Sequence, residues 1–511
     1  MQTVSVVKIL ISAVLTAGVL AGCAKNPVTG KNEISLVGQQ WELDVGRQNY
    51  SPLRQSQGGD YVADPAVEKY VKEVGLKLAA VSDRKLPYEF NVINDSTPNA
   101  WALPGGKIAI NRGLLTELES EAELAAVLGH EIVHAAARHG ARAQTRGLGL
   151  QAFVVGATIG LSDRLGGQGA QILSSVGAQL INQKYSRDAE LESDLYGMKY
   201  MAEAGYDLRG AVELQQTFVK LSAGRGQSGF EKLFASHPAS EERVRRNRAT
   251  AAKFGPGGTD GRERYQRVMK TLIKTKPAYE AFEQARAAYN KGEKSKAESL
   301  VKKAIRIQPR EALFHSAMGD IVADKKQFAA ARKHFDKAIS LNSDYFYYYL
   351  RRGQMNRVAK NFTAARRDLQ KSIELLPTPD AQEQLGDVAR LTNDPATAKK
   401  QYQLAARSGG QSAQAKLLSL DLEENPSAYL QTRQGVSNRG TLAVQITNST
   451  KVSLSNITVT VLSRASGKRV NRSVKGVLKG GGVTVLDTGI PIKQNQLGTV
   501  QVGVTDAQVA R

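Results

Sequence analysis

One helix-length stretch, residues 120–140, constrains this chain more than any other part of its sequence. It reads SEAELAAVLGHEIVHAAARHG and contains an H-E-x-x-H motif, in which His130 and His134 are four residues apart. On a helix this spacing places both imidazoles on one face, about one turn apart. Two such imidazoles can bind one tetrahedral Zn²⁺, and Glu131 beside them can act as general base toward a zinc-bound water.

The ends of this stretch carry the signals of a helix start and a helix stop. Ser120 followed by Glu123 forms a capping box, and Gly140 fits the position just after a helix end. The sequence therefore predicts one helix from Ser120 to Gly140. Because an H-E-x-x-H motif arises by chance in roughly one chain in a hundred of this length, a further ligand is needed to decide its meaning.

A second helical stretch, YSRDAELESDLYG at residues 185–197, offers the third ligand. Glu190 and Asp194 form an E-x-x-x-D pair on one helix face. A catalytic zinc held by two histidines and a glutamate keeps a fourth position open for water, which favours Glu190 as the ligand. Asp194, one turn later, is placed to accept a ring N–H from a ligating histidine. Glu192 is the competing ligand, but its side chain would point about 160° away from the Asp194 face.

Four separated stretches carry a family resemblance. They are the H-E-x-x-H helix, NAWALPGGKIAINRGLL (99–115), SRDAELESD (186–194) and SHPASEER (236–243). In their order along the chain and in their residues, these stretches resemble the CAAX-prenyl-protease-type zinc metallopeptidases, over roughly residues 25 to 250. Within that family the chain is similar to the soluble, lipid-anchored or periplasmic bacterial members. The resemblance implies a mainly α-helical, zincin-like metalloprotease domain with a small β-sheet.

The same resemblance implies a role for each matching residue. It implies one Zn²⁺ per chain, held by the two motif histidines and Glu190, with Glu131 as base. It places His237 of the S-H-P motif beside the metal and makes Arg243 an anchor of that segment. Three roles stay open for His237, and one of them is plain packing without a part in catalysis. It could be a latch that occupies the position of the water until substrate displaces it, or a hydrogen-bond donor to the oxyanion.

A short strand is expected just before the H-E-x-x-H helix. In residues 103–110, LPGGKIAI, the Pro and Gly residues predict a turn, and a strand follows it. The family resemblance makes Lys107, Ile108, Ala109 and Ile110 an edge strand that pairs with extended substrate. An unpaired edge offers main-chain hydrogen bonds to substrates of many sequences. The alternative is an internal strand without a role in substrate binding.

The N-terminus predicts an exported, lipid-modified protein. Residues 1–22 combine a positive charge at Lys8 with an apolar run too short to span a bilayer, as a signal peptide does. Residues 20–23 read L-A-G-C, which resembles a bacterial lipobox and makes Cys23, the only cysteine, the lipid attachment site. Ala24 follows instead of the Asp of retained inner-membrane lipoproteins, so we expect outer-membrane anchoring facing the periplasm of a Gram-negative bacterium. Residues 26–33, NPVTGKNE, are expected to be a short tether.

The charge of the chain restricts its partners. A formal net charge of +22 over 511 residues favours anionic partners such as phospholipid surfaces, lipopolysaccharide or acidic proteins. Because no nucleic-acid-binding motif accompanies this charge, nucleic acid is not expected as a partner.

Residues 147–183, between the two predicted ligand helices, are Gly-rich, apolar and nearly uncharged. Charged and Gly residues interrupt their apolar runs, which argues against a membrane-spanning helix. Three interpretations stay open: a mobile flap over the cleft, a surface that rests on lipid, and a plain helical hairpin packed on the core.

The second half of the chain predicts recognition modules. Alanines recur at spacings of 34, 34 and 33 residues, at Ala297, Ala331, Ala365 and Ala398. This is the tetratricopeptide pattern, in which small residues let paired helices touch, and its groove is expected to bind a peptide or partner helix. Alternating apolar and polar residues after residue 425 predict a small antiparallel β-sandwich, immunoglobulin-like in outline, that serves as a docking module.

A chain of this length is expected to divide into several domains. We predict a signal peptide 1–22, a zinc metallopeptidase domain 23–252, a linker 253–276, tetratricopeptide repeats 277–424 and a β-sandwich domain 425–511. The predicted function is that of a membrane-anchored zinc endopeptidase that cleaves periplasmic or outer-membrane proteins in envelope quality control. The alternative is an outer-membrane assembly factor or chaperone that acts through its repeat and sandwich domains while the protease is latent.

Overall fold

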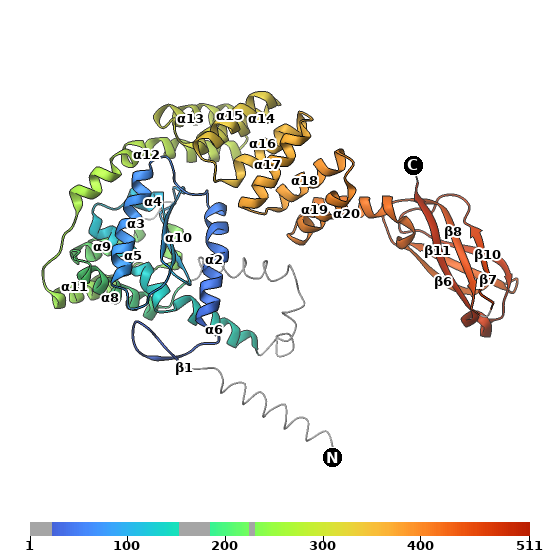
Figure 1. The fold of residues 1–511 in the computed structure, drawn as a ribbon, viewed down its shortest axis with the longest axis horizontal. Helices are drawn as coiled ribbons and strands as arrows, with labels where there is room; N and C mark the ends of the chain where they lie inside the picture. Colours follow the sequence, from blue (N-terminus) through green and yellow to red (C-terminus); the bar gives the residue numbers. More distant parts are fainter. Residues whose placement is uncertain (1–22, 153–183, 224–229, 465, 511) are drawn as a thin grey trace, which may run out of the picture. The chain divides into compact units, whose positions relative to one another are not determined.

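The computed structural model describes residues 23–152, 184–223, 230–464 and 466–510 (Figure 1). The predicted signal peptide and residues 153–183 of the Gly-rich segment lie outside the described residues. Among the helices of the described ranges, none combines the length and the apolar character needed to cross a membrane. The chain forms two compact units, Met1–Pro377 and Thr378–Arg511.

The first unit contains five short strands and most of the helices. Its strands are β1 (Cys23–Lys25), β2 (Asn32–Ile34), β3 (Glu89–Ile93), β4 (Ala100–Leu103) and β5 (Lys107–Asn111). The helices that precede the repeats are α2 (Gln39–Ser56), α3 (Pro65–Ala80), α4 (Arg112–Leu115), α5 (Glu121–Ala136), α6 (His139–Ala152), α8 (Arg187–Glu203), α9 (Arg209–Ala223), α10 (Glu231–Ser236) and α11 (Glu241–Phe254). The helices that follow are α12 (Arg262–Asn290), α13 (Lys294–Ile307), α14 (Ala312–Asp324), α15 (Phe328–Leu341), α16 (Phe346–Val358) and α17 (Phe362–Leu375).

A three-stranded sheet lies between α2 on one face and α3 and α5 on the other (Figure 1). Its strand order is β3-β5-β4, with β5 parallel to β3 and antiparallel to β4. The prediction that Lys107, Ile108, Ala109 and Ile110 form an edge strand is therefore wrong. β5 is the central strand, and its main chain pairs with a neighbour on each side. The edge strand that contacts α5 is β4.

The predicted helix of residues 120–140 is observed as two helices. The Ser120 hydroxyl accepts a hydrogen bond from the Glu123 amide at 3.2 Å, as an N-cap residue does. α5 then ends at Ala136, before the predicted stop at Gly140, because Arg138 has a left-handed φ of 61°. The Arg138 guanidinium is held there by buried Glu42, with 2.7 Å between Nε and Oε1. Gly140 belongs to α6, so it does not end the first helix.

The linker predicted over residues 253–276 is confined to residues 255–261, because α12 starts immediately after them. The side chains of Tyr265, Met269 and Leu272 on α12 are buried in the same hydrophobic core as α3 and α5. The first half of α12 therefore belongs to the peptidase core, and the same helix continues into the repeats.

The repeats begin in the first unit as the helix pairs α12–α13, α14–α15 and α16–α17. The small residues that define the repeat lie at the contacts between paired helices. A Cβ at Gly319 would lie 2.8 Å from the Phe335 ring, and Ala331 is fully buried. This packing agrees with the tetratricopeptide pattern of the sequence.

The second unit contains one more helix pair and a β-domain. Its elements are α18 (Pro379–Leu391), α19 (Pro395–Arg407), α20 (Gln411–Glu424), η2 (Pro426–Tyr429), β6 (Leu430–Val436), β7 (Thr441–Asn448), β8 (Leu454–Ser463), β9 (Arg469–Ser473), β10 (Val483–Pro491), η3 (Gln494–Thr499) and β11 (Val500–Val509). Two antiparallel sheets, β10-β7-β6 and β11-β8-β9, bury Val444, Ile446, Val459 and Val461 in one core. The paired sheets agree with the predicted β-sandwich.

Adjacent residues of α12 test whether this helix is part of the peptidase core. Leu272 is fully buried and Ile273 is 44% exposed. We expect Leu272→Ala to destabilise the core by about 3–5 kcal/mol, because it leaves a cavity, whereas Ile273→Ala stays within about 1 kcal/mol. Thermal unfolding of the full chain followed by circular dichroism measures the difference. Equal melting temperatures for the two variants would contradict the packing described.

Candidate metal centre

A close crossing of α5 and α8 brings the predicted ligands together. At the crossing the two backbones touch through Gly129 and Gly197. A Cβ at Gly197 would lie 3.0 Å from the His130 amide nitrogen, and a Cβ at Gly129 would lie 3.1 Å from the Gly197 carbonyl oxygen. Side chains at either position would push the helices apart, so the two glycines allow Glu190 on α8 to reach the histidines of α5.

Four side chains converge at this crossing. The ligand atoms of His130, His134, Glu190 and His237 all lie within 4.8 Å of one another, and the four residues are almost completely buried. The Nε2 atoms of His130 and His134 are 3.0 Å apart, and His134 Nε2 is 3.5 Å from Glu190 Oε1. His237 Nδ1 is 3.1 Å from Glu190 Oε1 and 3.3 Å from His130 Nε2.

These separations fit a tetrahedral zinc ion. With bonds of roughly 2.0–2.1 Å, a tetrahedral zinc holds its ligand atoms about 3.3 Å apart. Two nitrogen–nitrogen separations in the cluster are 3.0 and 3.3 Å, and three nitrogen–oxygen separations are 3.1 to 3.5 Å, within an overall limit of 4.8 Å. Three imidazoles and one carboxylate are also the ligand types that zinc accepts.

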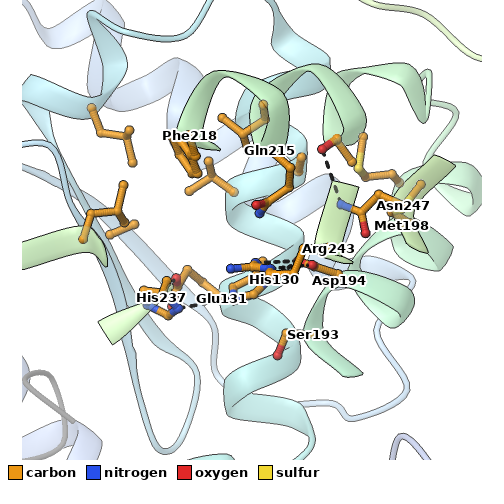
Figure 2. Close-up of a pocket in the computed structure, with 18 residues that line it drawn as sticks. His130, Glu131, Ser193, Asp194, Met198, Gln215, Phe218, His237, Arg243 and Asn247 are labelled. Atoms are coloured by element: carbon orange, nitrogen blue, oxygen red, sulfur yellow. Dashed lines mark hydrogen bonds and ion pairs between the residues drawn. The ribbon is translucent and has the colours of Figure 1, made fainter. Parts of the chain in front are cut away.

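Arg243 and Asp194 hold this cluster in place (Figure 2). The Arg243 guanidinium donates two hydrogen bonds of 2.7 Å to Asp194 and lies 2.9 Å from Glu190 Oε2. Asp194 Oδ1 lies 3.0 Å from His130 Nδ1, the ring nitrogen that faces away from the cluster. Burial alone would raise the pKa of Asp194, but Arg243 and the hydrogen bond with His130 outweigh burial and lower that pKa to about 2.

Glu131 lies beside the cluster and within ion-pair distance of one of its members, His237 (Figure 2). Its carboxyl group is buried, and its Oε2 atom has no hydrogen-bond partner among the described residues. The nearest basic group is His237, with 3.6 Å between Nε2 and Glu131 Oε1. Burial raises the pKa of Glu131, so this carboxyl group is suited to accept a proton.

The site is closed. The cavity that reaches His130, Glu131 and His237 has a volume of about 40 Å³, enough for little more than one water molecule. The Tyr185 ring stacks on the His134 imidazole, with 3.9 Å between ring centroids and 27° between ring planes. The Tyr185 amide donates to the Ser236 carbonyl oxygen at 3.4 Å, next to His237. Within the described residues, Tyr185 and the segment of His237 therefore cover the histidines of the cluster.

The structure adds one residue that the sequence analysis did not identify, His139, and shows the place of Glu192, the competing candidate for the third ligand. His139 is buried, and its Nδ1 atom lies 2.8 Å from His134 Nδ1, on the side of that ring opposite the cluster. Glu192 points away from the cluster, and its Oε1 atom lies 3.1 Å from His139 Nε2. A third histidine five residues after the motif was the only sequence signal for this contact.

The structure thus brings together seven of the residues predicted from the sequence: His130, Glu131, His134, Glu190, Asp194, His237 and Arg243. Lys107 and its neighbours on β5 do not line this cluster. Cys23, the predicted lipid attachment site, begins β1.

Comparison with known proteins agrees with the site. Residues 65–251 match the model of peptidase family M48, which confirms the family resemblance drawn from the four motifs. The chain is similar to the mitochondrial metalloendopeptidase OMA1 of Schizosaccharomyces pombe, with 34% identity over 226 residues, 43% of this chain and 64% of that protein. It is similar to the metalloprotease YcaL of Escherichia coli, with 32% identity over 171 residues, 33% of this chain and 64% of that protein.

A third relative is the beta-barrel assembly-enhancing protease of Escherichia coli. It is 28% identical over 220 residues, which are 41% of this chain and 44% of that protein. In each of these three comparisons, the chain spans less than two thirds of the relative's length.

Proposed function

Because residues 65–251 form a peptidase family M48 domain, we propose that this chain is a zinc-dependent endopeptidase. The observation that carries the proposal is the buried cluster of three histidines and one glutamate beside Glu131, whose Oε2 atom has no hydrogen-bond partner among the described residues. His130, His134 and Glu190 would hold one Zn²⁺ per chain. A zinc ion held there would act as a Lewis acid and would lower the pKa of a coordinated water toward 7.

Glu131 supplies the proton transfers of peptide hydrolysis. As general base it takes the proton of the attacking water, and it then returns this proton to the amine that leaves. Its burial and its unpartnered Oε2 atom support this role. Arg243 binds both Asp194 and Glu190, so it holds the proposed ligand Glu190 and also Asp194, which orients the proposed ligand His130.

We place substrate binding on β4. One side of Ala100–Leu103 pairs with β5, and within the described ranges no strand pairs with its other side. A small cavity between β4 and α5 is lined by Ala102, Leu103, His134 and Tyr185. An extended peptide could pair with this edge after Tyr185 moves aside, and its scissile bond would then lie near His134.

His237 is proposed to be a latch. Its Nδ1 atom belongs to the same cluster as the three proposed ligands, at distances suited to a fourth ligand. A fourth protein ligand would occupy the position that hydrolysis requires for water. The small volume of the cavity supports this resting state. A donor to the oxyanion would instead face the cleft and leave the metal position open.

The proposed setting is the outer membrane of a Gram-negative bacterium, facing the periplasm. The lipobox-like sequence before Cys23 supports anchoring by lipid, and the similarity to the beta-barrel assembly-enhancing protease supports a role in envelope protein quality control. Substrates would then be periplasmic or outer-membrane proteins.

The repeats are proposed to hold a protein segment. A cavity of about 590 Å³ lies between the β3–β4 loop and helices α12, α14 and α16, and it is lined by Tyr279, Tyr289, Tyr345 and Tyr347. Tyrosines offer both apolar contact area and hydroxyl groups to a bound peptide. This cavity also supports the second candidate function, that of an assembly factor with a latent protease, because the cavity could bind a client protein that is not cleaved.

The first test separates the base from the ligands. We expect Glu131→Gln to abolish cleavage of casein while the chain keeps its fold and about one zinc, because the change removes the base and no ligand. Glu190→Ala should lose zinc as well. Glu123→Gln, on the same helix but outside the cluster, is the matched control and should stay active. Cleavage by the Glu131→Gln variant at the wild-type rate would exclude this mechanism.

The second test concerns the latch. Removing a fourth ligand should free the metal position, so we expect His237→Ala to raise basal cleavage, including self-cleavage, with zinc content unchanged. If His237 is a donor to the oxyanion, the same variant should lose turnover by about 10²-fold. Initial rates of the purified variant, normalised to bound zinc, distinguish the two roles. A clear fall in rate would exclude the latch.

The third test concerns anchoring. Cys23→Ser removes the thiol that would carry lipid, so the variant should lack lipid modification and leave the outer-membrane fraction. Fractionation after a high-salt wash is the measurement, because salt screens attachment through the basic surface alone. Wild-type sedimentation of the Ser variant after this wash would show that lipid at Cys23 is not the anchor.

A further inference from the structure

Residues 26–33, predicted as a tether, are folded. β1 and β2 pair in antiparallel register, with Cys23 opposite Ile34 and Lys25 opposite Asn32. Asn26 closes the turn between them, because its Oδ1 atom accepts hydrogen bonds from the Val28 amide at 2.9 Å and the Thr29 amide at 3.2 Å. We refer to residues 23–34 as the N-terminal hairpin.

The side chain of Asn26 connects this hairpin to the metal site. Asn26 is only 1% exposed. Its Nδ2 atom donates to Glu33 Oε1 at 2.8 Å, and it lies 3.4 Å from both the Ala137 carbonyl oxygen and Glu192 Oε1. All three of these groups hold the buried Asn26 amide. Among them, Glu192 is the one that contacts His139, which lies beside His134.

Arg142 on α6 makes the second connection. One guanidinium nitrogen lies 2.9 Å from Glu33 Oε1, and the other lies 3.2 Å from Glu192 Oε1. Glu33 on the hairpin and Glu192 on α8 thus share one arginine. Two independent contacts, through Asn26 and through Arg142, join the hairpin to Glu192.

Glu192 reaches the cluster through His139. When His134 Nε2 binds a metal, the neutral ring carries its proton on Nδ1 and donates it to His139 Nδ1, 2.8 Å away. His139 then carries its own proton on Nε2 and donates to Glu192 Oε1 at 3.1 Å. In metal sites, a carboxylate that accepts from a ligating histidine fixes the orientation and tautomer of the ring. In this chain His139 lies between the Glu192 carboxylate and the His134 ring, so Glu192 acts on His134 through His139.

We propose that the N-terminal hairpin is a structural part of the metal site: it holds Glu192, and Glu192 orients His134 through His139. His139, Glu192 and Asn26 are therefore positioning residues. The inference rests on the proposed zinc site and goes beyond it, because it makes metal affinity depend on the segment that directly follows Cys23. Disturbing this segment weakens the site from a distance.

Zinc affinity measured by competition with a chromophoric chelator tests the proposal. The protein is the full mature chain carrying Cys23→Ser, so that it is soluble without lipid. We expect His139→Phe to lower zinc affinity by about 10–100-fold. His139→Gln, whose amide can accept from His134 and donate to Glu192, should recover most of the loss. Asn26→Ala should lower the affinity by about fivefold, the effect of one buried hydrogen bond, and Arg142→Gln should act in the same direction.

The control is Asn49→Ala, because Asn49 is also buried and donates to a carbonyl oxygen, that of Val45 at 2.8 Å, away from the cluster. Unfolding temperatures identify losses that are merely structural. If the Asn26→Ala and Asn49→Ala variants bind zinc equally well, the hairpin has no role at the site and the proposal fails. A parent chain that binds no zinc overturns the proposed function as well as this inference.

Discussion

Buried negative charge is the constraint on which the site depends. Glu131, Glu190 and Asp194 are buried in one small region, and Arg243 is the basic side chain that binds two of them. Burying an uncompensated carboxylate is costly, and one arginine balances only one of the three charges. A divalent cation held among the histidines, as proposed, would balance the remaining negative charge. The proposed shared ion also requires the close crossing of the helices at Gly129 and Gly197, which brings the four side chains together.

The closed state follows from how the chain covers this charge. His237 from the segment after α10 and Tyr185 before α8 both lie against His134, and the Tyr185 amide binds the Ser236 carbonyl oxygen. The two covering residues are therefore linked, and a movement that withdraws one also releases the other. The edge strand β4, where substrate binding is proposed, lies under the same cover, because Ala102 and Leu103 line one small cavity with His134 and Tyr185.

The sequence predicted the site better than its surroundings. The periodicity of His130 and His134 and the spacing of Glu190 and Asp194 are local properties of helices, so they could be read directly. The central position of β5 in its sheet could not be predicted from the sequence. Strand order depends on pairing with β3 and β4, and the local pattern of apolar and polar residues does not encode this pairing. The early end of α5 depends on the contact of Arg138 with Glu42. The links from His139 to the N-terminal hairpin join residues more than a hundred positions apart.

The repeats in the second half of the chain could be predicted from the sequence for the same reason. Small residues at a fixed repeat report helix-to-helix contacts that recur locally, so the pairs from α12 to α19 follow the predicted spacing. The C-terminal boundary of the peptidase core could not be predicted in this way, because Tyr265 and Leu272 of α12 join that core through tertiary packing. The sequence of α12 is strongly charged and gives no sign of this burial.

X-ray absorption at the zinc edge, on the purified full chain with its metal content quantified, tests the central claim most directly. The account predicts one zinc per chain with four nitrogen or oxygen ligands, and with the scattering pattern of three imidazoles in the resting protein. A chain that takes up no zinc, or a zinc surrounded by six oxygen ligands without imidazole scattering, would contradict the account.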